Sequence, residues 1–172
     1  GAQFLPQEFL QRSKVEQWLM WQMANLGPMV GQAITFNRFV KEKVPYAIER
    51  YGSESRRLYA VLDNQLRDGR PFLCGDLSIA DFACFPWVRA HRMAKVRIDG
   101  LSNLEAWLAR LKQRAGVRCG LSVGFPDSAL GREMGERYAN DKTMTEEQKR
   151  AFMQSGNDML HEKADSLRDQ QN

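Results

Sequence analysis

The stretch "GDLSIADFACFPWV", residues 75–88, places a carboxylate inside the most apolar run of the chain. An ionised group in an apolar core is costly unless it is paired, hydrogen-bonded or catalytic. Ser78, followed three residues later by Asp81, matches a capping box, in which the Ser78 hydroxyl accepts from the Asp81 amide and the Asp81 carboxylate accepts from the Ser78 amide. The spacing therefore favours a structural role for Asp81, at the start of a helix, over the role of a catalytic acid.

The residues on either side of this cap support the same interpretation. Leu77 and Phe82 have the spacing of a hydrophobic staple, and a carboxylate in the first turn complements the positive end of the helix dipole. From Ile79 onward the helix is apolar on all faces, which is typical of a buried central helix. The sequence therefore predicts that this helix lies in the core.

Helical spacing of apolar residues also dominates the chain on both sides of this helix. It predicts a long antiparallel pair, residues 7–39 against residues 45–67, with an end or a kink of the first helix at Gly27 and Pro28. A shorter amphipathic helix follows over residues 101–111. No segment shows sustained strand alternation, so the fold is expected to be an all-α bundle with the capped helix at its centre.

Composition excludes several functional classes. The 172 residues are 43% hydrophobic and 27% charged, as in ordinary globular domains, and no apolar run is long enough for a membrane span. Residues 1–17 show no signal-peptide pattern, so a cytoplasmic location is expected. Three cysteines without CxxC spacing and two separated histidines argue against a disulfide scaffold and a zinc site.

The net charge of +4 is concentrated in the first part of the chain. Its densest basic stretch is "RAHRMAKVR", residues 89–97, which is a candidate for nucleic-acid binding. This stretch has no interleaved aromatic residues, and it lies near a helix C-terminus, where cations are favoured in any case. Nucleic acid is therefore not an expected partner.

The pattern of apolar residues becomes sparser towards the C-terminus. After Thr143 the helix-start signals are followed by a thin apolar stripe of Phe152, Met159, Leu160 and Leu167. So little apolar area offsets the entropy of ordering poorly, which indicates a solvated or partly disordered segment. We therefore expect a helical domain over residues 1–125 and a C-terminal extension over residues 126–172.

Several runs of sequence, in this order, carry a family resemblance. They are "QWLMWQMANLGPMVGQ", "YAIERY" with "RLYAVLD", "FLCGDLSIADFACFPWV" and "LEAWLARLKQRAGVRCGL". Together they resemble the C-terminal helical domain of glutathione transferases, and they are most similar to the nu-class, disulfide-reductase-like branch. In that family the capping box and staple of the central helix are a folding element. The long tail and "RAGVRCGL", where the family usually has a proline, depart from the pattern.

The resemblance implies a missing half. Family members carry a thioredoxin-like domain that precedes the helical one, binds glutathione and supplies the residues that activate its thiol. No βαβ pattern is present in these 172 residues, so we expect the chain alone to be inactive. It is either the C-terminal part of a longer enzyme, which is the favoured interpretation, or a natural stand-alone helical domain.

The resemblance also implies site residues. Met29, Gln32 and Phe36 would line the hydrophobic co-substrate site, and Arg50 would point to the glutathione of the neighbouring subunit in a homodimer. Met29 and Phe36 have core packing as an alternative role, since these residue types at helical spacing are usually core. Arg50 has a weak ion pair with Glu54 as its alternative.

Two functional classes therefore remain open. One is the co-substrate-binding and dimerisation domain of a glutathione transferase or glutathione-dependent disulfide reductase, acting on a small electrophile or a disulfide with glutathione as co-substrate. The other is a non-catalytic helical interaction module. A reading frame for a thioredoxin-like domain upstream of residue 1 would favour the enzyme.

Overall fold

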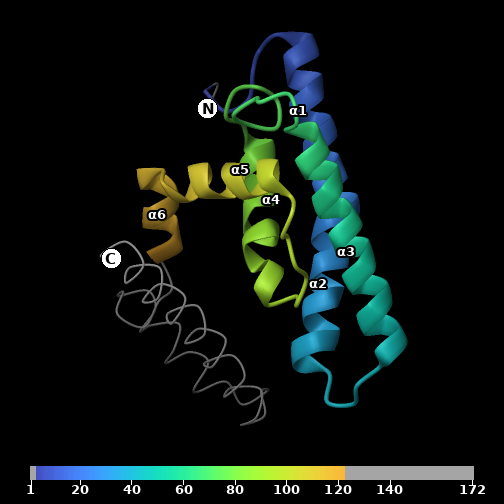
Figure 1. The fold of residues 1–172 in the computed structure, drawn as a ribbon. Coiled ribbons are helices and arrows are strands. Elements are labelled where there is room, and N and C mark those ends of the chain that lie inside the picture. The colour runs from blue at the N-terminus through green and yellow to red at the C-terminus, as the bar shows by residue number, and fades with distance from the viewer. Residues whose placement is uncertain (1–2, 123–172) are drawn as a thin grey trace, which may run out of the picture. The chain divides into compact units, whose positions relative to one another are not determined.

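The computed structural model describes residues 3–122, and every regular element in that range is a helix (Figure 1). The all-α expectation is confirmed there, and the only extended pairings in the same range are two isolated bridges, Phe72 with Gly75 and Cys74 with Asp76. The predicted C-terminal extension lies outside the described residues. The α-helices are α1 (Phe9–Trp21), α2 (Gly27–Ile34), α3 (Pro45–Gln65), α4 (Ile79–Arg89), α5 (Ser102–Lys112) and α6 (Ala115–Ser122), with π-helical turns η1 (Gln22–Leu26) and η2 (Thr35–Phe39) and a 3-10 turn η3 (Ala90–Arg92).

The chain divides into two compact units, Gly1–Arg114 and Ala115–Asn172. The first contains α1 to α5. Of the second, the structure describes only the eight-residue helix α6. No helix among the described residues has the length and apolar character needed to cross a membrane.

Of the two expected outcomes at Gly27 and Pro28, an end or a kink, the structure excludes the end: the helical backbone continues, with a π-helical turn directly before Gly27. Pro28 has no N–H and its ring crowds the carbonyl four residues earlier, which disrupts a regular α-helix. The chain accommodates this with the π-helical turn η1 directly before Gly27, where the hydrogen bonds span five residues. The side chain of Asn25 adds a bond by donating to the Trp21 carbonyl at 3.1 Å.

The predicted antiparallel pair is confirmed. Figure 1 shows α1 and α2 running beside α3, with α4 packed against the pair and α5 lying crosswise to it. The contact between α2 and α4 depends on glycine, because a Cβ at Gly27 would lie 3.3 Å from the Trp87 ring and 2.9 Å from the Gln22 amide. Tyr59 links α3 to α4, since its hydroxyl donates to the Trp87 carbonyl at 3.0 Å.

The start of α4 has the predicted capping box, formed by Ser78 and Asp81. The Asp81 side chain is fully buried, and one of its oxygens accepts from both the amide and the hydroxyl of Ser78, at 3.0 and 3.1 Å. Its other oxygen accepts from the Leu73 amide at 3.0 Å and from the Trp107 indole at 2.9 Å. The carboxylate therefore joins the loop before α4, the first turn of α4 and helix α5.

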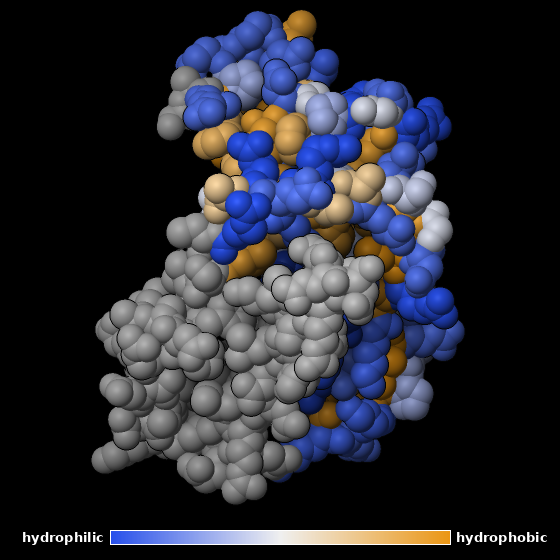
Figure 2. Space-filling view, turned by 60° about the vertical axis from the view of Figure 1, so that its left-hand side comes forward, coloured by the Kyte–Doolittle hydropathy of each residue, from blue (hydrophilic) through white to orange (hydrophobic). Residues whose placement is uncertain are grey.

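The burial of α4 is less complete than its composition predicts. Its buried side includes Cys84, Phe85 and Val88, but Phe82 is 36% exposed and Pro86 is also exposed. The expectation of an apolar helix buried on all faces is therefore wrong for one face, where Phe82 packs edge-on against Phe4 with ring centres 5.2 Å apart. On the side shown in Figure 2, hydrophobic residues show only in short bands between hydrophilic ones.

Helix α5 begins without a capping side chain of its own. Asp63 of α3 takes that role from a distance, because its carboxylate accepts from the Leu104 amide at 2.9 Å and from the Asn103 side chain at 3.2 Å. A carboxylate at the N-terminus of a helix satisfies free amides and complements the dipole. Asp63 thus fixes the start of α5 to α3, and α5 in turn presents Trp107 to Asp81.

Candidate functional site

The three predicted co-substrate residues follow one another at spacings of three and four residues, Met29 and Gln32 in α2 and Phe36 in the π-helical turn η2. Met29 and Phe36 are half-buried and Gln32 is exposed. The Phe36 ring stacks on that of Tyr51 in α3, with ring centres 5.6 Å apart and planes at 13°. Phe36 therefore contributes to the packing of the hairpin and keeps part of its surface accessible.

The alternative role for Arg50, an ion pair with Glu54, is wrong. The Glu54 carboxylate is held by Arg57, whose guanidinium donates to both of its oxygens at 2.8 Å. This bond is the main reason that the pKa of Glu54 lies below its usual value, and the charge of Arg50 is a minor contributor. Arg50 is exposed, and among the described residues its guanidinium makes no hydrogen bond or ion pair.

Arg50 is not joined to the three predicted co-substrate residues by a hydrogen bond or ring contact among the described residues. Tyr51 is on the side of α3 that meets α2, and Arg50, one residue earlier, is about 100° around the helix on an exposed side that it shares with Tyr46. Within the described range no hydrogen bond or ring contact links Arg50 to Met29, Gln32 or Phe36. The hairpin therefore offers two neighbouring surfaces, one partly apolar and one cationic.

The described thiols are not activated. Burial, with a smaller contribution from the Asp81 charge, raises the pKa of Cys74 to about 11, and the same two causes raise the pKa of Cys84 well above its usual range. Both are therefore neutral thiols near pH 7, and a neutral thiol is a poor nucleophile. The part of the chain that the structure describes also has no cluster of three or more side chains able to hold a metal ion.

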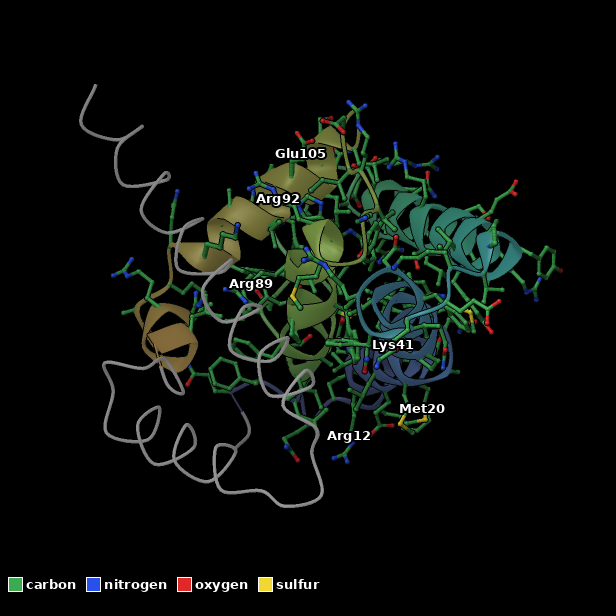
Figure 3. All side chains as sticks on the ribbon, turned by 90° about the horizontal axis from the view of Figure 1, so that it is seen from below. Arg12, Met20, Lys41, Arg89, Arg92 and Glu105 are labelled. Atoms are coloured by element: carbon green, nitrogen blue, oxygen red, sulfur yellow. The ribbon has the colours of Figure 1, made fainter. Side chains whose placement is uncertain are left out.

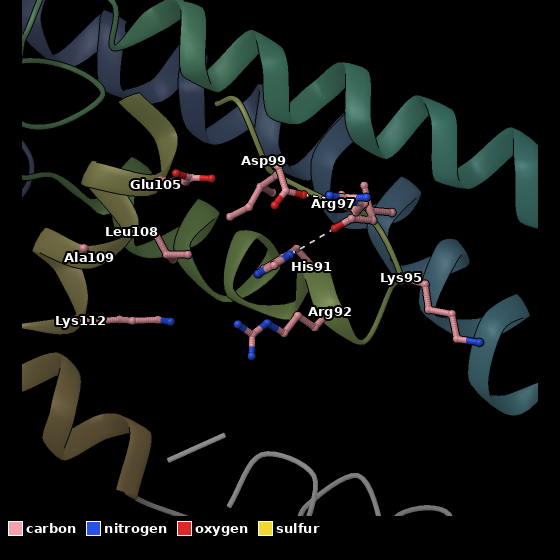
Figure 4. Close-up of a pocket in the computed structure, with 11 residues that line it drawn as sticks. His91, Arg92, Lys95, Arg97, Asp99, Glu105, Leu108, Ala109 and Lys112 are labelled. Atoms are coloured by element: carbon pink, nitrogen blue, oxygen red, sulfur yellow. Dashed lines mark hydrogen bonds and ion pairs between the residues drawn. The ribbon is translucent and has the colours of Figure 1, made fainter. Parts of the chain in front are cut away.

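A cavity of about 570 Å³ lies on another side of the first unit (Figure 4). It is formed by η3, the segment after it and helix α5. Sequence reasoning considered residues 89–97 only as a basic stretch and did not find this cavity. The signal that could have indicated the α5 wall is the spacing of Glu105, Leu108 and Lys112, which puts them on one side of a helix. The cavity is lined by His91, Arg92, Lys95, Val96, Arg97, Ile98, Asp99, Glu105, Leu108, Ala109 and Lys112.

The His91 ring is oriented by the backbone. Its Nδ1 lies 3.1 Å from the carbonyl oxygen of Val96, so Nδ1 carries a proton and donates to that oxygen. This leaves Nε2 as the second polar atom of the ring. Lys95, in the same turn, has a φ of 55°, which is uncommon for a residue with a side chain. The turn after α4 therefore has a defined and unusual backbone that fixes His91.

Comparisons with known proteins agree on a family. Residues 45–110 match the family model described as the glutathione S-transferase C-terminal domain. The Escherichia coli K12 protein named disulfide-bond oxidoreductase YfcG is 42% identical over 112 residues, which cover 64% of this chain and 52% of that protein. Disulfide-bond oxidoreductase YghU of the same organism is 32% identical over 158 residues, which cover 86% of this chain and 54% of that protein.

Solved structures give the same answer. A glutathione transferase family member from Pseudomonas fluorescens pf-5, described with two glutathione bound, superposes with a TM-score of 0.64 at 38% identity, covering 70% of this chain and 56% of that one. The chain spans about half the length of the curated relatives named above. The family-model match over residues 45–110 covers α3, α4 and most of α5, including the Asp81 cap. The chain therefore carries a region that matches the glutathione S-transferase C-terminal domain, and its similarity to the two disulfide-bond oxidoreductases and to the glutathione transferase structure supports the disulfide-oxidoreductase-like branch of that family.

Proposed function

We propose that this chain is the co-substrate-binding and dimerisation part of a glutathione transferase or glutathione-dependent disulfide reductase. In this proposal a thioredoxin-like domain binds most of the glutathione and activates its thiol. The helical domain adds a surface for the electrophile or disulfide, formed by Met29, Gln32 and Phe36, and Arg50 reaches the glutathione bound to a second copy. The residue ranges 1–125 and 126–172 remain our proposed division into this domain and an extension.

The observation that carries the proposal is the uncommitted charge of Arg50. Glu54, the acid one turn away, is taken by Arg57, so the Arg50 guanidinium keeps its five donors for another molecule. Glutathione carries carboxylates, and a planar guanidinium binds a carboxylate through two parallel hydrogen bonds. An accessible aromatic ring, Phe36, lies on the adjoining surface and suits a nonpolar co-substrate.

The same proposal predicts that the chain alone is inactive. A transferase or disulfide reductase needs a thiolate. Cys74 and Cys84 do not supply one near neutral pH, because the pKa of both thiols is raised. Without a domain that activates glutathione, a bound co-substrate has no nucleophile to react with. We expect no turnover of a chloronitrobenzene or of hydroxyethyl disulfide above a heat-killed control.

The test compares the chain alone with a form that has a family-type glutathione-binding domain ahead of residue 1. Activity is expected only in the second form. In that form Phe36→Ala should raise the KM for the electrophile or disulfide by roughly three- to tenfold, because a nonpolar contact of this size contributes about 1 kcal/mol. The matched control is Phe9→Ala, which removes an aromatic ring that is 78% exposed on α1. Turnover by the chain alone, or equal KM values for the two variants, would contradict the proposal.

A non-catalytic interaction module is the second candidate. Exposed nonpolar side chains such as Phe9, Leu10, Met20 and Met23 give the helical domain surface for protein contacts. A form with the added domain that binds glutathione but turns over neither substrate would favour this alternative. A homodimer and a cytoplasmic location stay predictions under both candidates.

A further inference from the structure

The outer side of α3 has a row of four exposed side chains. Glu49, Arg50 and Ser53 follow Tyr46 by three, four and seven residues, so all four share one side of this regular helix. Tyr46 is 73% exposed, and the other three are exposed as well. In Figure 3 the side chains of α3, the teal helix, extend outward on the side away from Arg92, which follows α4. The buried residues of α3 lie on its other side: Ala47, Ser55, Leu58, Tyr59 and Leu62.

The functional groups of this row are available to another molecule. Among the described residues, the Tyr46 hydroxyl, the Glu49 carboxylate and the Arg50 guanidinium make no hydrogen bond or ion pair. Glu49 and Arg50 are adjacent in the chain, and adjacent side chains of a helix do not face each other. Only Ser53 is engaged, since its hydroxyl donates to the Arg50 carbonyl at 3.1 Å. The row therefore offers one anion, one cation and one phenol.

The two charges lie on either side of Tyr46. At 100° per residue, Glu49 falls about 60° to one side of Tyr46 and Arg50 about 40° to the other side. Their side chains start from neighbouring Cα atoms, which are about 3.8 Å apart. Both are long side chains, so their ends can reach two opposite charges that a ligand carries on one carbon atom.

An α-amino acid head group has this pattern of charge. Its carboxylate is suited to a guanidinium, which donates two parallel hydrogen bonds, and its ammonium is suited to a carboxylate or a phenol oxygen. Glutathione carries such a head group at its γ-glutamyl end, whereas its glycine end is a carboxylate alone. Glu49 beside Arg50 disfavours the glycine end, because like charges repel. The γ-glutamyl end is therefore the better fit.

We propose that this row on α3 binds the γ-glutamyl head group of glutathione held by a second copy. Glu49 accepts from the ammonium, Arg50 donates to the α-carboxylate, and the Tyr46 ring lies against the methylene groups between the head group and the peptide. This inference rests on the proposed function, which assigns Arg50 to glutathione. It adds the end of glutathione that is recognised and two further binding residues, Glu49 and Tyr46.

The experiment titrates glutathione into the form that carries a family-type glutathione-binding domain and follows the heat of binding. Glu49→Gln keeps the size of the side chain and removes its charge, so it should weaken binding by roughly three- to tenfold. The matched control, Glu105→Gln, removes an exposed acid from α5 and should bind like the wild type. Equal affinities for Glu49→Gln and the wild type would overturn the inference. Circular dichroism melts establish that both variants are folded.

Two glutathione derivatives identify the end that is recognised. N-acetylglutathione lacks the ammonium and keeps both carboxylates, and the glycyl ethyl ester keeps the whole γ-glutamyl head group. The ratio of wild-type affinity to Glu49→Gln affinity cancels the contacts that each ligand makes with the added domain. This ratio should fall to about one for N-acetylglutathione and stay at roughly three- to tenfold for the ester. The reverse pattern would assign the row to the glycine end and overturn the inference.

A third variant tests the aromatic ring. Tyr46→Ala removes the nonpolar contact with the methylene groups and should weaken glutathione binding by roughly two- to fivefold. Its control is Phe9→Ala, which removes a ring that is 78% exposed on α1 and should have no effect. Equal affinities for these two variants would overturn the role of Tyr46.

Arg50→Lys separates a failure of this inference from a failure of the proposed function. If Arg50→Lys weakens glutathione binding and Glu49→Gln does not, the proposed function stands and recognition of the γ-glutamyl head group is overturned. If both variants bind like the wild type, both proposals are overturned. Weakening by both variants, with the Glu49→Gln effect absent for N-acetylglutathione, is the result expected here.

Discussion

The start of α4 and the exposed side of α3 show two different uses of a charged side chain. Asp81 is fully buried, and four donors from three parts of the fold converge on its two oxygens. Arg50 is exposed, and its guanidinium makes no hydrogen bond or ion pair among the described residues. Both residues carry a single charge on a helix, but their different surroundings give Asp81 a structural role and leave Arg50 available for binding.

The difference teaches how to separate structural charges from charges that are available for binding. A buried carboxylate is tolerated only when its oxygens are satisfied, so its removal leaves several donors without partners. An exposed guanidinium is hydrated in both the folded and the unfolded state, so its removal changes the free energy of unfolding little. Stability measurements and binding measurements should therefore respond to these two residues in opposite ways.

The largest effect on stability is expected for Asp81→Ala. It leaves the Leu73 and Ser78 amides and the Trp107 indole without their acceptor in the core. Each buried donor left unsatisfied costs about 1–3 kcal/mol, so the free energy of unfolding should fall by at least about 3 kcal/mol. Urea titration measures this. The control is Asp76→Ala, at an exposed position in the same loop, which should change the unfolding free energy by less than about 0.5 kcal/mol. Similar midpoints for the two variants would mean that the Asp81 network carries no stability.

A smaller loss of stability is expected for Asp63→Ala, which removes the acceptor for the Leu104 amide at the start of α5. The site is only partly buried, and loss of a helix cap typically costs about 1–2 kcal/mol. Asn103→Ala, which removes only the longer bond to Asp63, should cost less. If Asn103→Ala proved the more destabilising of the two, capping of α5 by Asp63 would be the wrong account.

The smallest stability effect is expected at Glu8, the N-cap of α1. Its carboxylate accepts from the Leu10 and Gln11 amides at 2.9 and 2.8 Å, and these bonds hold its pKa below the usual 4.5. A lowered pKa in the folded state means that the carboxylate stabilises the fold above about pH 4.5 and that this contribution is lost as the pH falls further. Melting temperatures of wild type and Glu8→Gln should therefore differ slightly at pH 7 and converge at pH 3. A difference that is the same at both pH values would contradict this role.

Local sequence patterns predicted the parts of the fold whose causes are local. The Ser78–Asp81 capping box and the apolar stripes of the long hairpin are read from residues three and four apart, and the structure has both. The other two donors to Asp81, Leu73 and Trp107, come from residues 8 and 26 positions away, and no local pattern indicates them. The cap of α5 by Asp63 was missed for the same reason, since the two partners are 41 positions apart.

The sites follow the same rule. The Arg50–Glu54 pair was expected from helix spacing alone, but Arg57 lies at an equally suitable spacing and takes the carboxylate with two bonds. Helix spacing places both Arg50 and Arg57 within reach of Glu54, so spacing alone does not determine which of them forms the ion pair. The cavity was not found, because it joins the basic stretch after α4 to a side of α5 through tertiary packing. Its prediction requires the crossing of α5 over the end of α4, which no spacing within either segment encodes.

The measurement that tests the central claim most directly is a calorimetric titration of glutathione into the form that carries a family-type glutathione-binding domain. Wild type, Arg50→Lys and Arg57→Lys are compared, the last being an exposed arginine on the same helix that is already paired with Glu54. The account predicts that Arg50→Lys weakens glutathione binding by about 1–3 kcal/mol, because Lys cannot reproduce the two-bonded contact of a guanidinium, and leaves the melting temperature almost unchanged. Arg57→Lys should bind glutathione like the wild type. Equal affinities for Arg50→Lys and the wild type would contradict the claim and leave Arg50 as a solvated helix residue.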